Sequence, residues 1–116
     1  MSELFEKDAL LDGIDGDIEF LGETIEMLDE DSAELLEQAQ DAVTAGDSEA
    51  LVGPAHALKG MLGNFCAPPA EAAAYRVERM GREGQMDEAQ AAVEALREEV
   101  QRLRDALHAF LDEQQP

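Results

Sequence analysis

Residues 51–70 read LVGPAHALKGMLGNFCAPPA, and this stretch differs from the rest of the chain in its charge. It contains one charged residue, Lys59, and no acid. Residues 1–50 contain 17 acids and one base, and residues 71–116 contain 11 acids and six bases. A chain with a formal net charge of −20 therefore has one acid-free window, and that window surrounds a histidine, His56.

The apolar residues of this window follow a helical period, which predicts a helix with one buried face. They are Leu51, Ala55, Leu58, Leu62 and Phe65. His56 falls on nearly the opposite side of the helix, so we expect its imidazole to be exposed. Gly53, Gly60 and Gly63 share the side of His56, and Lys59 lies within one turn of it.

Glycine inside a helix costs about 1 kcal/mol relative to alanine, so glycines on an exposed face call for a reason. One reason is access, because a second protein can approach a helix closely where side chains are missing. A neutral, exposed imidazole is also a nucleophile that can accept a phosphoryl group, and a nearby cation can pair with that anion. The alternative is that an exposed histidine and several glycines coincide on a solvated helix. The residues alone leave both interpretations open.

The remaining sequence predicts further helices and no strand, since Ala, Leu, Glu and Gln are abundant and Val, Ile and aromatic residues are few. The His56 helix begins at Asp47 or Ser48 and ends near Cys66, with either a kink at Pro54 or a separate turn over 48–52. Before it, we expect a short helical segment around Lys7–Leu11 and a long helix over 17–45, which begins at an Asp17 cap and ends at Gly46. After it, we expect a helix over 68–82, stopped by Gly81 and Gly84, and a last helix that begins at an Asp87 cap and ends at about Glu113.

Four long amphipathic helices with short connections predict an all-α fold, an antiparallel four-helix bundle with a short N-terminal helical segment. The length of 116 residues suggests a single domain over 1–116, with a core of about 15–112. The strong negative charge disfavours nucleic acid and anionic lipid as partners. The sequence has no long apolar run and no signal-peptide pattern, so we expect a cytoplasmic protein without a membrane span, and by default a monomer. A single cysteine, Cys66, excludes an internal disulfide.

The motif His56-Ala57-Leu58-Lys59-Gly60, with Ala55 before it, strongly resembles the core of the histidine-containing phosphotransfer (HPt) domain. Residues 63–67, GNFCA, resemble the family's Gly-Asn-Phe-Gly-Ala variant, with Cys66 in place of a common glycine. Val77-Glu78 and the following residues 81–84, GREG, resemble the family's Leu-Glu pair and its Gly-x-x-Gly-type end. Together the similarities cover about residues 15–112.

The resemblance implies a carrier in two-component signalling, which exchanges phosphoryl groups with aspartates of response-regulator receiver domains, often those of a hybrid sensor histidine kinase. His56 would be the phosphoacceptor, Lys59 would orient or neutralise the phosphoryl group, and Gly60, with Gly53 and Gly63, would give the partner access. The receiver would supply Mg²⁺, so the chain would need no cofactor or metal of its own. The sequence contains no phosphate-binding loop, which agrees with a carrier that is not an enzyme. The alternative is an acidic helical module that binds receivers without being phosphorylated. Whether the chain stands alone or is a domain of a hybrid kinase stays open.

Three other groups of residues are weaker candidates. Asp105 and His108 form one copy of a motif that a di-metal site needs twice, so His108 is expected to be solvated. Acids between Asp15 and Glu26 match some positions of a calcium loop, but Phe20 stands where that loop requires glycine. The arginines at 76, 79 and 82 share a helical face, which favours salt bridges to the protein's own helices over a rim for an acidic partner.

Overall fold

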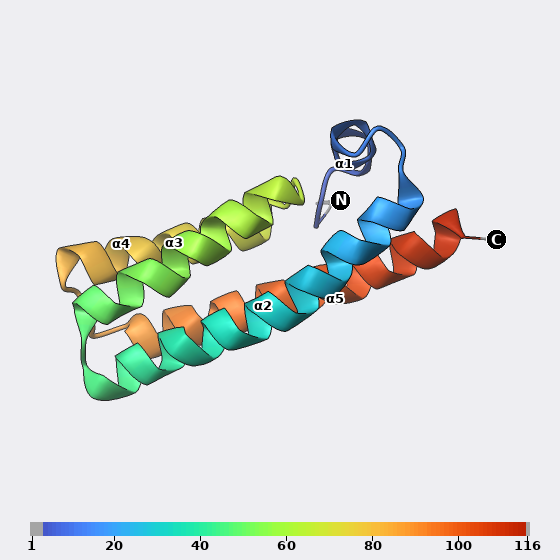
Figure 1. The fold of residues 1–116 in the computed structure, drawn as a ribbon. Helices are drawn as coiled ribbons and strands as arrows, with labels where there is room; N and C mark the ends of the chain where they lie inside the picture. Colours follow the sequence, from blue (N-terminus) through green and yellow to red (C-terminus); the bar gives the residue numbers. More distant parts are fainter. Residues whose placement is uncertain (1–3, 116) are drawn as a thin grey trace.

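The computed structural model describes residues 4–115 and consists of five helices with no strand over that range. A short helix, α1 (Lys7–Gly13), precedes four long ones: α2 (Ile18–Ala45), α3 (Ser48–Asn64), α4 (Pro68–Glu83) and α5 (Ala89–Gln114). The four long helices run alternately up and down, and each contacts two others in the order α2, α3, α4, α5 (Figure 1). The predicted antiparallel four-helix bundle is confirmed. None of the helices in the described part of the chain is long and apolar enough to span a membrane.

The ends of the helices follow from local chemistry that the sequence displays. Asp17 accepts a hydrogen bond from the backbone N–H of Phe20 at 3.0 Å, and Asp47 accepts one from Ala50 at 3.1 Å, so both act as N-caps. Gly46 follows α2 with φ of 68°, the left-handed conformation that glycine adopts at least cost. The helix over 17–45 is uninterrupted, and the acids from Asp17 to Glu26, for which a calcium loop was disfavoured, belong to the capped start of α2.

The interior of α3 settles one alternative that the sequence left open. The helix is continuous from Ser48 to Asn64 with Pro54 inside it, so no separate turn covers 48–52. Leu51, Ala55, Leu58 and Leu62 are fully buried along one side of α3, as their spacing predicts. At the end of this helix Cys66 has φ of 56°, a conformation that favours glycine, and its carbonyl accepts the backbone N–H of Glu6 at 2.8 Å.

A short N-terminal segment closes one end of the bundle core. Phe5 and Leu10 are buried, and the Phe5 ring packs edge-on against Phe110 of α5 with 5.4 Å between centroids. Figure 1 shows α1 near the start of α2, beyond the ends of α3 and α4. The predicted helical segment around Lys7–Leu11 is thus confirmed, and it covers the end of the core.

Two predicted boundaries were wrong. Asp87 does not cap the last helix, because the chain turns at Asp87 and Glu88 and α5 begins at Ala89, without a side-chain cap. Gly81 does not stop α4, which continues to Glu83 and ends at Gly84. Gly81 is buried where α4 meets α3, and a Cβ there would lie 2.9 Å from the carbonyl oxygen of Ser48 and 3.0 Å from Val52 Cγ2. The glycine thus permits close packing of two helices rather than ending one.

We expect Gly81→Ala to lower the free energy of unfolding by about 1–3 kcal/mol, because the added methyl group forces α3 and α4 apart. The matched control is Gly60→Ala, the same substitution in a helix at a position with no atom within 4 Å of the added Cβ. That variant should gain up to about 1 kcal/mol from helix propensity. Urea unfolding of the three proteins measures both effects, and equal stability of the two variants would contradict the packing role of Gly81.

Candidate functional site

His56 stands on the outer side of α3, and its side chain is 62% exposed. The exposure predicted from the helical wheel is confirmed. Its chain neighbour Ala55 is fully buried, as is Leu58 two residues later, so the core-facing side of α3 holds the backbone of His56 in place. A fixed helix therefore presents an imidazole to solvent.

The imidazole is held from one side by a buried carboxylate on the neighbouring helix. Glu78 of α4 is 2% exposed, and its Oε2 lies 3.0 Å from His56 Nδ1. A buried charge is costly unless it is paired. Lys59 Nζ lies 2.8 Å from Oε1, and Arg82 donates from Nε and Nη2 to Oε2 at 3.0 and 2.7 Å. Glu78 and its three partners, His56, Lys59 and Arg82, form a four-residue cluster. His56 lies on the solvent side of this cluster.

The electrostatics of this cluster assign the protons. Contact with the Lys59 ammonium, the largest influence, together with Arg82 and His56, outweighs burial and lowers the pKa of the Glu78 carboxyl to about 2. Glu78 is therefore ionised at neutral pH and can only accept hydrogen bonds. The neutral His56 ring then carries its proton on Nδ1 as the donor to Glu78. Its second nitrogen, Nε2, keeps the lone pair and makes no hydrogen bond to the described residues.

Lys59 and Glu78 differ in how well the sequence predicted them. Lys59 lies beside His56 as expected, with its side chain 28% exposed and its ammonium 5.3 Å from the ring centroid of Tyr75. The sequence indicates Glu78 only as part of a family-like Val-Glu pair and predicts no role for it at the site. A signal was present, because Glu78 interrupts the buried side of α4 formed by Ala74, Val77 and Gly81.

The three glycines near His56 have two different environments. A Cβ on Gly60 or Gly53 would meet nothing within 4 Å, so both leave open surface. Gly53 also precedes Pro54, and a side chain before proline disfavours helical backbone. Gly63 is different, because a Cβ there would lie 2.9 Å from Oε2 of Glu71. Open surface is thus found beside His56 at Gly60 and Gly53, while a partner-access role for Gly63 stays a prediction.

The arginines of α4 pair with carboxylates of the same chain. Arg79 contacts Glu83 at 3.2 Å, Arg76 contacts Glu88 at 3.4 Å, and Arg82 contacts Glu78 at 2.7 Å. These contacts agree with the favoured interpretation of salt bridges within the protein. Of these three salt bridges, only the one between Arg82 and Glu78 involves a buried carboxylate, and both residues belong to the His56 cluster.

His108 is not simply solvated, contrary to expectation. Its Nε2 lies 2.7 Å from Oδ2 of Asp29 on α2, and Arg104 Nε lies 2.7 Å from the other oxygen of that carboxylate. The three residues tie α5 to α2 at the surface of the bundle. Asp105 makes a separate hydrogen bond with Gln101 on the same helix. The Asp105/His108 pair thus has ordinary structural partners.

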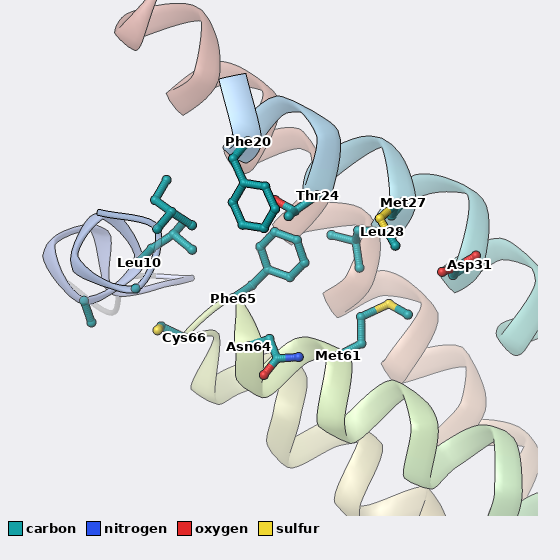
Figure 2. Close-up of a pocket in the computed structure, with 13 residues that line it drawn as sticks. Leu10, Phe20, Thr24, Met27, Leu28, Asp31, Met61, Asn64, Phe65 and Cys66 are labelled. Atoms are coloured by element: carbon teal, nitrogen blue, oxygen red, sulfur yellow. The ribbon is translucent and has the colours of Figure 1, made fainter. Parts of the chain in front are cut away.

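A groove opens where α1, the first half of α2 and the end of α3 meet (Figure 2). Phe20 and Met27 of α2 line it and are 46% and 59% exposed, and Met61 and Asn64 line it from α3. Figure 2 shows Phe20 of α2, Phe65 and Leu10 of α1 around the opening. Asn64 lies two turns beyond His56 on α3, about 12 Å along the helix at 1.5 Å per residue. The groove therefore lies on the same helix as the exposed imidazole, about two turns further along it.

Comparison with known proteins places this architecture in a family. The model of the Hpt domain matches residues 23–106, most of the chain. The chain belongs to the Hpt domain family, and it is a histidine phosphotransfer carrier of phosphorelay signalling.

A solved structure has the same fold. It is the crystal structure of histidine-containing phosphotransfer protein B (HptB) from Pseudomonas aeruginosa PAO1, which is 22% identical and superposes with a TM-score of 0.89 over 97% of this chain and 98% of that one. Comparison with curated proteins gave no match.

Proposed function

We propose that His56 is the residue that carries the phosphoryl group, and that it exchanges this group with aspartates of receiver domains. The observation that supports this most strongly is the exposed imidazole whose Nδ1 is tied to the buried Glu78 at 3.0 Å. A ring held in this way has one tautomer and one free nucleophilic nitrogen, Nε2. His108 lacks this arrangement, because its Nε2 is engaged by Asp29.

In the proposed reaction Nε2 attacks the phosphorus of a receiver aspartyl phosphate in line with the bond that breaks. The Nε2–P bond forms, the P–O bond to the aspartate breaks, and the electron pair leaves with the receiver carboxylate. Positioning and charge stabilisation are enough for such a transfer. Lys59, one turn from His56, supplies a positive charge for the phosphoryl oxygens. Any Mg²⁺ would belong to the receiver, and this chain would contribute no metal or nucleotide site of its own.

The receiver would cover the open surface at Gly53 and Gly60 and extend over the groove next to Asn64. Exposed apolar side chains rimmed by polar residues are typical of protein interaction sites. Phe20 and Met27 have this character in a chain whose surface is otherwise strongly acidic. We expect the natural partner to be a receiver of a response regulator or of a hybrid sensor histidine kinase, bound by one copy of this chain in the cytoplasm.

We expect Met27→Glu to weaken receiver binding, because it places a charge on the apolar side of the proposed interface. Burying one methionine side chain stabilises a complex by about 1.5–3 kcal/mol, and losing that contribution lowers the affinity about tenfold or more. Titration of the transfer rate with receiver concentration should show a higher half-saturating concentration. Glu37→Gln, a change on an exposed part of α2 outside the groove, is the control. Equal half-saturation for Met27→Glu and the natural protein would contradict docking at the groove.

The test of the proposed function is transfer of labelled phosphate. Receiver domains are charged with labelled acetyl phosphate and mixed with the purified chain. The label should move to the chain and should be labile in acid and stable in base, as expected for phosphohistidine. A chain that binds the same receivers and takes no label from any of them would instead be the non-phosphorylated binding module.

A further inference from the structure

The residue that holds His56 carries a full negative charge, and orientation of the ring does not require one. A neutral amide oxygen could accept the Nδ1–H bond equally well in geometry. Burying a carboxylate at 2% exposure is costly, and this one needs both Lys59 and Arg82 to compensate it. The charge of Glu78 therefore calls for a function that an amide could not serve.

We propose that Glu78 is the counter-ion of the phosphorylated ring and thereby makes phospho-His56 a strong phosphoryl donor. The inference rests on the proposed function, in which His56 carries the phosphoryl group. It assigns Glu78 as a positioning residue that acts through the ring, since it does not touch the transferred group itself.

The proton balance of the transfer explains why a carboxylate is needed. When the neutral ring attacks through Nε2 and keeps its Nδ1 proton, the product is a cationic ring bearing the phosphoryl group. In the reverse transfer the Nε2–P bond breaks, the electron pair returns to Nε2, and the neutral ring leaves with its Nδ1 proton in place. No proton moves in either direction. If the ring loses that proton while phosphorylated, the leaving group becomes an imidazolate, which leaves poorly.

The charges around the ring favour the cationic form. Glu78 of α4 contacts the ring, and Glu78 is in turn contacted by Arg82 from α4 and Lys59 from α3. Tyr75 lies against Lys59, and the Glu71 carboxylate lies beside Gly63. Glu78, Lys59 and Arg82 together carry one net positive charge before transfer. The dianionic phosphoryl group and a cationic ring then bring this group of charges to neutrality, whereas loss of the Nδ1 proton leaves a negative excess beside the ionised Glu78. The cluster therefore holds the proton on the ring and still accepts the phosphoryl anion.

The experiment labels His56 without a receiver. The purified protein is phosphorylated with phosphoramidate, the reagent is removed, and loss of phosphohistidine is followed by ³¹P NMR between about pH 5 and pH 9, a range centred near the ordinary histidine pKa. Glu78→Gln should hold its phosphoryl group longer, with the fall in hydrolysis rate displaced to lower pH, and should return it to a receiver at least about tenfold more slowly, a change of about 1.4 kcal/mol in the barrier. Glu83→Gln is the matched control, since Glu83 pairs with Arg79 on the same helix and does not contact His56.

A second measurement does not depend on any variant folding. The ¹⁵N and ¹H resonances of phosphorylated His56 in the natural protein should show the Nδ1 proton retained to higher pH than in a phosphohistidine peptide. Loss of the proton at the same pH as the peptide, or identical decay of Glu78→Gln and the natural protein, would overturn the counter-ion role. Absence of any phosphohistidine at His56, from phosphoramidate and from receivers alike, would instead overturn the proposed function.

Discussion

His56→Gln is expected to reduce phosphoryl transfer to the chain by at least about a thousandfold, in effect to background, because glutamine offers no nucleophilic nitrogen. The fold should be unaffected, since the His56 side chain is 62% exposed and its removal opens no core cavity. Some stability should be lost, because Glu78 loses one of its three partners and keeps Lys59 and Arg82. Transfer from a labelled receiver, followed by gel autoradiography, measures the first effect, and thermal unfolding measures the second.

The matched control for this variant is His108→Gln, which removes the other histidine of the chain. His108 pairs with Asp29 across α2 and α5 and has no buried carboxylate behind it, so its variant should accept label at the rate of the natural protein. Label that persists in His56→Gln and disappears in His108→Gln would show that the phosphoacceptor has been assigned to the wrong ring.

Gly60→Gln is expected to separate stability from function more clearly than any other change. No atom lies within 4 Å of a Cβ at this exposed position, so the first side-chain atom of the glutamine meets no obstacle in the isolated protein. Replacing a helical glycine should raise the free energy of unfolding by about 0.5–1 kcal/mol. The new side chain nevertheless projects one turn from His56 into the surface that a receiver must cover, and transfer from a receiver should fall at least about tenfold, a cost of about 1.4 kcal/mol.

Two comparisons show whether this loss is steric. Phosphoramidate is small and should phosphorylate Gly60→Gln at close to the natural rate, because His56, Glu78 and Lys59 are unchanged. Gly60→Ala, which adds a single carbon, should transfer at a rate between those of the natural protein and Gly60→Gln. If Gly60→Gln exchanged phosphate with receivers as fast as the natural protein, the open surface at Gly60 would have no part in partner access.

Much of the fold could be predicted because it depends on short-range chemistry. The spacing of Leu51, Leu58 and Leu62 placed one side of α3 in the core, and the same spacing placed His56 in solvent. Asp17 and Asp47 cap helices through their own third neighbours, so their roles are visible within four residues of sequence. The start of α5 was mispredicted because Asp87 is a good capping residue by type, whereas the chain turns at Asp87 and Glu88 and α5 begins at Ala89 without a side-chain cap.

The sequence by itself determined the helices, the exposed histidine and its nearby lysine, since each of these follows from the period of one helix. The tertiary structure alone decided what lies behind the imidazole. Glu78 is 22 positions from His56 along the chain, and it reaches Nδ1 because α3 and α4 pack so closely that a Cβ on Gly81 would lie 2.9 Å from the Ser48 carbonyl oxygen. Helical periodicity states which way a side chain points. Which group on another helix meets it depends on the relative rotation and separation of the two helices, and those are set by packing.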